Sequence, residues 1–134
     1  MPFVHTHRVR YVEVDAQGVV FNAHYLTFCD DAMTRFIAAL GYDPKVTFAE
    51  GGPFDIMLVR SVVEWRSGAG FEDELAIEVV PTRLGSSSFD ITFTMRVDDR
   101  DIAEVVTTYV SVVPGEHRSC PIPDDVRASL EAQM

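Results

Sequence analysis

The sequence predicts an α+β domain in which one long helix packs against an antiparallel sheet of about five strands. Two observations predict this class. Apolar residues recur with helical spacing through residues 25–40, and four later segments are rich in β-branched and aromatic residues between short turn motifs. With 134 residues, the chain is long enough to bury a hydrophobic core and is expected to form a single domain, 1–134.

The N-terminal part is expected to form a strand and then a turn. Residues Val4–Val14 alternate in part between two faces, as in a half-buried strand. The next four residues, Asp15 to Gly18, are a turn motif, because Gly18 can adopt backbone angles that are closed to other residues. Asn22 is expected to be the N-cap of the following helix, since its side chain can accept hydrogen bonds from the first helical N–H groups.

The long helix is expected to run from Tyr25 to Leu40. Its apolar residues fall three and four positions apart and make a wide stripe, so other structure must enclose much of the helix. These residues are Tyr25, Leu26, Phe28, Cys29, Ala32, Met33, Phe36, Ile37 and Leu40. Gly41 is expected to end the helix, with Pro44 shortly after it. A single helical turn is expected within Lys45–Glu50.

The rest of the chain is expected to be mostly strand. The four segments are Asp55–Arg66, Glu74–Leu84, Ser88–Val97 and Ile102–Val113. The connections 85–87 and 98–101 are short enough for antiparallel hairpins, and a short helix is expected near Asp124. The main order is therefore β-α-β-β-β-β. One helix against so many strands leaves an edge or a face of the sheet for a second copy, which predicts a homodimer at least.

Composition and charge exclude several classes of protein. The formal net charge is −10, which disfavours extensive binding to nucleic acid or to an anionic membrane. No stretch approaches the ~18 apolar residues that a membrane helix needs, and residues 1–10 lack the apolar run of a signal peptide. Cys29 and Cys120 lie far apart, so a cytoplasmic protein with both thiols reduced is expected.

The histidines do not predict a metal site. His5 and His7 would share one face of a strand, but no Cys, Asp or Glu with zinc-like spacing joins them. His24 could carry a proton, although a lone histidine in the first turn of a helix is more often a surface or packing residue. No metal ion is expected.

The junction before the long helix combines two catalytic ingredients. Asp15 lies a few residues before the helix N-terminus, where backbone N–H groups lack partners and carry a partial positive charge. A carboxylate can act as a nucleophile or as a general base, and such N–H groups can stabilise an oxyanion. The alternative is a purely structural Asp15, whose carboxylate is satisfied by backbone N–H groups of its own turn. Both interpretations stay open at this point.

The segment 8–32, RVRYVEVDAQGVVFNAHYLTFCDDA, resembles the signature of hot-dog-fold acyl-CoA thioesterases, in particular the 4-hydroxybenzoyl-CoA thioesterase and YbgC-like group. The shared pattern is Asp15, then Gly18, two apolar residues, an aromatic–polar pair and Tyr25. Two weaker similarities accompany it. Residues 85–89, GSSSF, open a later strand, and a Pro-Ile-Pro tail precedes the last helix. Together with the order of the elements, these similarities cover nearly the whole chain.

The resemblance implies a hot-dog fold, a dimer with its active sites between subunits, and thioester hydrolysis without a metal or a serine triad. It implies that Asp15 is the catalytic nucleophile or general base and that the backbone N–H of Asn22 polarises the thioester carbonyl. Gly18 would let the chain approach the substrate closely. The apolar acyl slot would be lined by Val19, Val20, Phe21 and Tyr25.

A second set of polar residues is a candidate for binding the pantetheine or phosphate groups of the substrate. The set is Arg83, Ser86, Ser87 and Ser88, with Arg60 as a further arginine. Their alternative role is an ordinary hairpin turn beside solvated strand arginines. The chain departs from the resembled group at Asn22, where the YbgC-like enzymes usually carry His and the benzoyl-CoA type carries Tyr. It also lacks the basic run that the benzoyl-CoA type carries before the Ser-Phe pair. These departures leave the acyl group and its carrier open.

The sequence therefore predicts a thioesterase that hydrolyses an acyl or aroyl thioester of coenzyme A, or of an acyl carrier protein, to the free acid and thiol. Coenzyme A enters only as part of the substrate, and no other cofactor is expected. The expected assembly is a homodimer or homotetramer, with no nucleic-acid or membrane partner. Two alternatives stay open. One is a non-catalytic hot-dog protein that binds an acyl ligand or serves assembly, and the other is a dehydratase, for which only His24 is near the acid.

Overall fold

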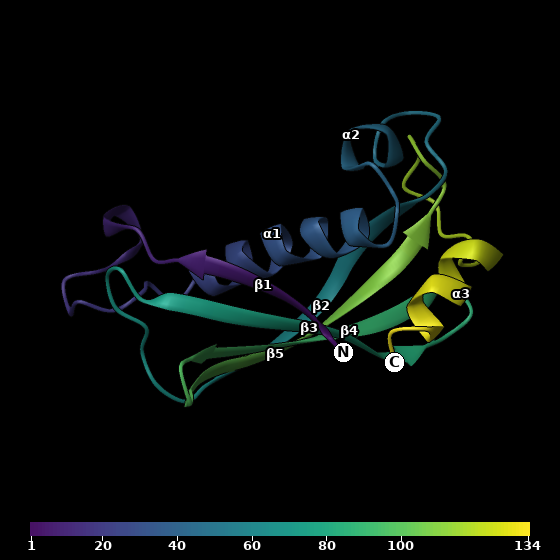
Figure 1. Cartoon of the computed structure of the whole chain (residues 1–134). Helices are drawn as coiled ribbons and strands as arrows, with labels where there is room; N and C mark the ends of the chain where they lie inside the picture. Colours follow the sequence, from purple (N-terminus) through teal and green to yellow (C-terminus); the bar gives the residue numbers. More distant parts are fainter.

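A five-stranded antiparallel sheet curves around helix α1 in the computed structural model, which describes residues 1–134 (Figure 1). The strands are β1 (Phe3–Arg8), β2 (Asp55–Trp65), β3 (Glu74–Leu84), β4 (Ser88–Val97) and β5 (Arg100–Val112). The helices are α1 (His24–Ala39), α2 (Pro44–Thr47) and α3 (Asp124–Glu131), with a 3-10 turn, η1, at Tyr11–Glu13. The strand order is β1-β3-β4-β5-β2, and every neighbouring pair is antiparallel. The predicted α+β architecture is confirmed.

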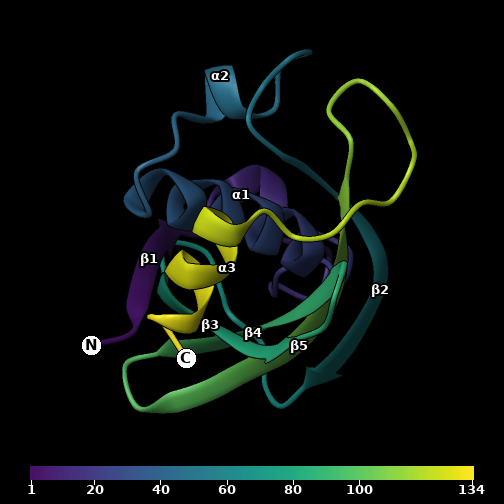
Figure 2. The same ribbon diagram turned by 90° about the vertical axis from the view of Figure 1, so that its right-hand side faces the viewer.

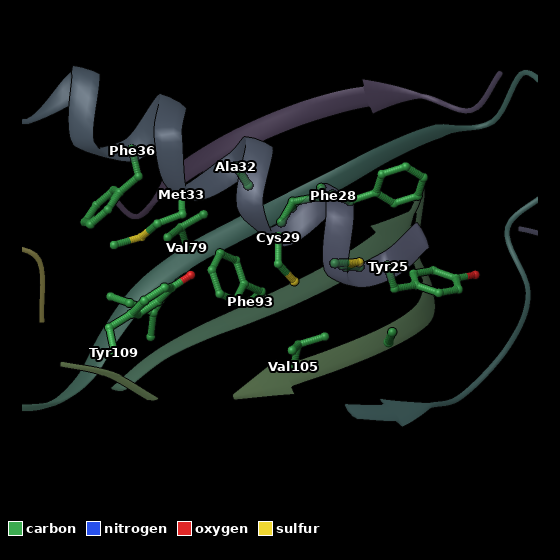
Figure 3. Packing of buried hydrophobic residues seen from close by; sticks show 14 of the residues in the cluster. Tyr25, Phe28, Cys29, Ala32, Met33, Phe36, Val79, Phe93, Val105 and Tyr109 are labelled. Atoms are coloured by element: carbon green, nitrogen blue, oxygen red, sulfur yellow. The ribbon is translucent and has the colours of Figure 1, made fainter. Parts of the chain in front are cut away.

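Helix α1 lies along the inner face of the sheet and buries most of the predicted apolar stripe. Its buried residues are Tyr25, Phe28, Cys29, Ala32, Met33, Phe36 and Ile37. Alternate residues of β3 from Leu75 to Pro81 and of β4 from Phe89 to Met95 are buried toward them, including Val79 and Phe93 (Figure 3). Phe36 is fully buried, and burying a side chain of this kind contributes about 1.5–3 kcal/mol. The core between α1 and the sheet therefore fixes where the helix begins, next to the Asp15 turn.

The predicted strand Val4–Val14 breaks after β1, and its second half forms the turn η1. The cause is Glu13, whose carboxylate accepts the backbone N–H of Arg10 at 2.7 Å and the Arg10 guanidinium at 2.8 Å. These side-chain hydrogen bonds close a turn where a strand would need ladder partners. Only Val14 pairs again, in an isolated antiparallel bridge with Val20.

Asn22 is not the N-cap of α1, contrary to the prediction. Ala23 holds that position with helical backbone angles, φ −69° and ψ −24°, and no side chain caps the helix. The reason is a turn that precedes the helix. The N–H of His24 donates to the carbonyl of Phe21 at 3.0 Å, so the backbone already satisfies the donor that the Asn22 side chain was expected to bind.

The two short helices are close to their predicted places. α2 begins after Asp43, whose carboxylate accepts the Lys45 N–H at 3.0 Å, and it ends three residues before the predicted limit at Glu50. α3 starts at Asp124 as predicted and lies at the end of the sheet that holds the β3–β4 turn (Figure 1). No helix of the chain combines the length and the apolar character that crossing a bilayer requires.

The two edges of the sheet differ in length and character. β1 is a short edge, whereas β2 is an eleven-residue edge that bonds to β5 on one side only (Figure 2). β2 exposes the large apolar side chains Met57, Leu58, Val59, Val62 and Trp65. A long apolar strand with one unpaired side is a template for pairing with another chain.

Candidate functional site

The turn that carries Asp15 is a tight hairpin just before α1. The N–H of Asp15 donates to the carbonyl of Val19 at 2.9 Å, and the N–H of Gly18 donates to the carbonyl of Asp15 at 3.0 Å. Val14 and Val20 pair across the base of the hairpin. Gly18 has a φ of +79°, a conformation that costs glycine little and strains other residues. This is the turn that the sequence predicted.

The carboxylate of Asp15 is bound through one of its two oxygens. Oδ1 accepts the backbone N–H of Gln17 at 2.8 Å, which is the bond that the structural interpretation expects. Oδ2 accepts no hydrogen bond from the chain, and the residue is partly exposed. One oxygen therefore holds the turn while the other can meet water or a substrate, and the two interpretations of Asp15 are compatible.

The start of α1 presents backbone donors without acceptors. The N–H groups of Asn22 and Ala23 bond to no carbonyl or side chain. The carbonyl of Phe21 accepts the N–H of His24, and in a trans peptide the following N–H, that of Asn22, points in the opposite direction. The dipole of α1 adds a partial positive charge at this end. The junction thus holds the kind of donors that an oxyanion site needs.

A hollow of about 250 Å³ opens beside these donors. Its lining residues are Val19, Val20, Asn22, Tyr25, Trp65, Arg66, Ser67 and Gly68. The structure therefore brings together four residues of the predicted site, with the Asp15 hairpin adjoining them. Phe21 does not line this hollow, because its half-exposed ring lies edge-on to His24 with the centroids 5.9 Å apart. Gly18 belongs to the hairpin and not to the lining.

The sequence did not identify the loop 66–70 as part of this region. The N–H of Val20 donates to the carbonyl of Ala69 at 2.9 Å, and Val19 pairs with Gly70. Gly68 approaches Val19 so closely that a β-carbon at position 68 would lie 2.6 Å from Val19 Cγ1. The available signal is the pair of glycines on either side of Ala69, which in the sequence suggest a turn and nothing more.

Tyr25 forms the inner wall of the hollow. Its side chain is 2% exposed, and its hydroxyl accepts the N–H of Ala69 at 3.4 Å. Burial raises the pKa of Tyr25, although the hydrogen bond from the Ala69 N–H and the charge of Arg100 oppose this increase, and the Asp15 carboxylate adds a smaller contribution to it. The hydroxyl therefore stays protonated at neutral pH, and Tyr25 lines the hollow as an uncharged residue.

Glu13 is a buried carboxylate that the sequence did not single out. It is 3% exposed. Its Oε1 accepts His7 Nε2 at 2.8 Å and the Arg10 N–H at 2.7 Å, while Oε2 accepts the Arg10 guanidinium at 2.8 and 3.1 Å. Burial raises the pKa of Glu13, but the hydrogen bonds from Arg10 and His7 outweigh burial and lower the pKa to about 2.

Acid should therefore destabilise the fold through Glu13. Its ordinary pKa of 4.5 falls to about 2 on folding, so the charged carboxylate stabilises the fold above pH 4.5 and the gain is lost as pH falls toward 2. A shift of this size corresponds to about 3 kcal/mol. We expect the free energy of unfolding in urea to fall between pH ~5 and ~3 in the wild type. The free energy of unfolding of Glu13→Gln should be lower at pH ~5 and should fall less steeply with decreasing pH. Equal slopes of this free energy against pH in both proteins would exclude Glu13 as the titrating group.

The second predicted set of site residues lies at the other end of the sheet. Arg83 and Ser86–Ser88 surround the β3–β4 turn, whereas the Asp15 hairpin adjoins the start of β3 (Figure 1). The eleven residues of β3 separate the two ends by about 35 Å. One copy of the chain therefore does not bring these residues to Asp15.

The residues of the β3–β4 turn also have partners within the chain. The Arg83 guanidinium donates to Asp90 at 3.0 Å and to the Ser88 hydroxyl at 3.0 Å. The carbonyls of Ser86 and Ser87 accept backbone N–H groups from the C-terminal tail and from β5. The turn is well ordered by these bonds, and only the hydroxyls of Ser86 and Ser87 and part of the guanidinium are left without a partner in the chain.

A second hollow, of about 260 Å³, lies between α1, β2 and β5. It is lined by Asp30, Met33, Thr34, Phe48, Asp55, Ile56, Leu58 and Tyr109. The Tyr109 hydroxyl is buried without a hydrogen-bond partner, and burial raises the pKa of both Tyr109 and Asp30. No residue of this hollow belongs to the hollow beside the start of α1.

The remaining candidates, His24 and Cys29, pack against other side chains of the chain. The His24 ring lies between Phe21 and Phe28, with centroid distances of 5.9 and 6.5 Å. Cys29 is buried, and burial raises the pKa of its thiol, which makes it a poor nucleophile. No three His, Cys, Asp or Glu side chains gather in a way that could hold a metal ion.

Comparison with known proteins assigns the family. Residues 9–130 match the family model described as the thioesterase-like superfamily. The chain belongs to this superfamily. The matched range contains the Asp15 hairpin, all of α1 and the four later strands, so the resemblance drawn from segment 8–32 is confirmed at the level of the family. The finer assignment to the 4-hydroxybenzoyl-CoA thioesterase and YbgC-like group stays a prediction.

Individual relatives agree with this assignment. A protein of Thermosynechococcus vestitus named 1,4-dihydroxy-2-naphthoyl-CoA hydrolase is 29% identical over 125 residues, which cover 92% of this chain and 85% of that protein. A thioesterase-superfamily structure from Jannaschia sp. CCS1 superimposes with a TM-score of 0.92 at 22% identity, covering 99% and 93% of the two chains. A gentisyl-coenzyme A thioesterase superimposes with a TM-score of 0.85 at 24% identity, covering 96% and 99%. These structures confirm the predicted fold.

Proposed function

We propose that this chain hydrolyses an acyl- or aroyl-CoA thioester to the free acid and coenzyme A. The observation that carries the proposal is the junction of hairpin and helix. Asp15 keeps one carboxylate oxygen free, and the N–H groups of Asn22 and Ala23, a few residues later, have no acceptor. A base or nucleophile and an oxyanion site are the two ingredients that thioester hydrolysis needs. Val19 and Val20 supply apolar walls for the acyl group.

Two routes are compatible with this junction. In the first, the Asp15 carboxylate attacks the acyl carbon, the C–S bond breaks, the thiolate leaves and takes up a proton, and water hydrolyses the resulting anhydride. In the second, Asp15 removes a proton from a water molecule while the water oxygen attacks the acyl carbon. The C–S bond then breaks, which releases the acid, and the leaving thiolate takes the proton from Asp15. In both routes the carbonyl oxygen becomes an oxyanion, to which the Asn22 N–H would donate.

The names of the relatives support a coenzyme A thioester as the substrate. Several curated relatives are named 1,4-dihydroxy-2-naphthoyl-CoA hydrolase, and one structural neighbour is named a gentisyl-coenzyme A thioesterase. We therefore place an aroyl-CoA first among the candidate substrates and an acyl carrier protein thioester after it. A cytoplasmic location remains a prediction of the sequence.

We further propose that the active form is a homodimer joined through β2. The free edge of β2 is long and apolar, and pairing two such edges antiparallel about a twofold axis would extend the sheet across both copies. In such a pair, the strands of the second copy run in the opposite direction to the corresponding strands of the first. The end that carries Ser86–Ser88 in one copy would then lie toward the Asp15 end of the other, where these residues could contact the pantetheine arm. A homotetramer would be a pair of such dimers.

The test is release of free thiol from a panel of thioesters by the purified chain. The panel contains 1,4-dihydroxy-2-naphthoyl-CoA, benzoyl-CoA, an unbranched acyl-CoA, and the same acyl groups on an acyl carrier protein. We expect turnover of at least one CoA thioester, with the aroyl thioesters fastest. Turnover of the carrier-bound acyl groups alone would identify an acyl carrier protein thioester as the substrate and would leave the proposed chemistry unchanged. Binding of CoA thioesters without any thiol release would favour the non-catalytic alternative, in which the bond from Gln17 to Asp15 only closes a turn.

A further inference from the structure

Glu13 is the one charged residue among the buried residues of the chain. Burying a carboxylate is unfavourable unless hydrogen-bonded partners compensate it, and here both oxygens are fully engaged by Arg10 and His7. Glu13 lies two residues before Asp15, and its side chain bonds beyond its own turn, to His7 of β1.

The Glu13 side chain connects three elements. Arg10 belongs to the entry into η1, and His7 lies on β1. The His7 ring in turn packs on Phe28 of α1, with the centroids 4.4 Å apart. The carboxylate therefore fixes η1 against both the first strand and the long helix.

The backbone of Glu13 connects the two groups that the proposed reaction uses. Its carbonyl accepts the N–H of Phe21 at 3.0 Å, and the next N–H along the chain is the unpaired one of Asn22. On the other side, Glu13 is followed by Val14, whose bridge to Val20 closes the hairpin that carries Asp15. One residue is thus bonded to both the base of the hairpin and the entry to α1.

We propose that Glu13 is a positioning residue, which sets the placement of the Asp15 carboxylate relative to the Asn22 N–H; this inference rests on the proposed function. Glu13 does not contact the substrate. It acts through the Phe21 peptide and the hairpin base, so its loss should impair the chemical step more than the binding of the thioester.

The main test compares Glu13→Gln with the wild type in thioester hydrolysis. Glutamine keeps the shape of the side chain, but its amide group would meet the donors of Arg10 and His7. Because a small displacement of reacting groups costs up to ~10²-fold in rate, we expect kcat to fall ~10–100-fold, with KM changed less than ~3-fold. Arg10→Gln keeps the carboxylate and removes only the guanidinium bonds, so it should give a smaller fall in kcat with the same sign.

A matched variant separates positioning from loss of stability. Val126, 2% exposed, lies in α3 at the far end of the sheet, so Val126→Ala lowers stability without touching the hairpin. We expect Val126→Ala to keep the wild-type kcat at temperatures where both variants are folded. An equal fall of kcat in Val126→Ala and Glu13→Gln would overturn the inference.

Amide hydrogen exchange provides a readout that does not need catalysis. The Phe21 N–H, which bonds to the Glu13 carbonyl, should exchange at least ~10-fold faster in Glu13→Gln, while amides of β3 and β4 change together by the global loss of stability. Unchanged Phe21 protection relative to those strands would overturn the inference. Should the wild type release no thiol from any thioester, the proposed function fails, and the Phe21 exchange still decides whether Glu13 fixes the entry to α1.

Discussion

Replacing Asp15 by asparagine is expected to lower kcat/KM for the best thioester by ~10²–10⁴-fold. Asparagine keeps an oxygen that can accept the Gln17 N–H, which Asp15 Oδ1 accepts at 2.8 Å, so the hairpin should persist. The neutral amide, however, neither attacks the acyl carbon nor removes a proton from water. Steady-state thiol release measures the effect, and circular dichroism with Tm shows that the variant is folded.

Asp43→Asn is the matched control for Asp15→Asn. The Asp43 carboxylate accepts the N–H of Lys45 at 3.0 Å, two residues later, which is the same local bond at the start of α2. This variant should keep the wild-type kcat/KM. If Asp15→Asn were as active as Asp43→Asn, the carboxylate of Asp15 would have no part in the chemistry.

Two lysines on the edge of β2, in Val59→Lys/Val62→Lys, are expected to convert the proposed dimer into a 15.0 kDa monomer without thioesterase activity. Both valines are well exposed in the single chain, at 58% and 40%, so the protomer core is not disturbed. Paired strands would bring like charges together, and lysine on an edge resists strand pairing. Activity should be lost with the dimer, because Ser86–Ser88 lie at the far end of the sheet from Asp15 in one copy. Size-exclusion chromatography with light scattering measures the mass.

The control for the β2 variant is a lysine on the other edge of the sheet. Val4 lies on β1 and is 49% exposed, so Val4→Lys adds a charge to an edge that the proposed dimer does not use. It should stay dimeric and active. A wild-type chain that is monomeric and active at micromolar concentration would refute the proposed dimer.

Elements whose signal is local were predicted well from the sequence. β3 and β4 have the predicted bounds, Glu74–Leu84 and Ser88–Val97, because alternating burial and short polar turns define them within a few residues. The stripe of α1 was visible for the same reason, since its spacing depends only on the helix itself. The Asp15 turn was found through Gly18, whose positive φ the sequence anticipates.

The rest depended on contacts between residues far apart in the chain. Gly68 lies against Val19, and neither segment contains a sequence pattern that predicts this contact. The turn η1 replaces part of the predicted strand because the Glu13 side chain is hydrogen-bonded to His7 and Arg10. The alternating pattern of the sequence does not reveal these side-chain bonds. Asn22 has a side chain suited to an N-cap, but the N–H of His24 donates to the carbonyl of Phe21 instead.

Single-turnover thiol release, with enzyme in excess over the best aroyl-CoA, tests the central claim most directly because it isolates the chemical step from product release. Wild type and Asp15→Asn should be compared in the same buffer at equal enzyme concentration. The account predicts complete thiol release by the wild type and a rate at least ~10²-fold lower in Asp15→Asn. Equal single-turnover rates would contradict it.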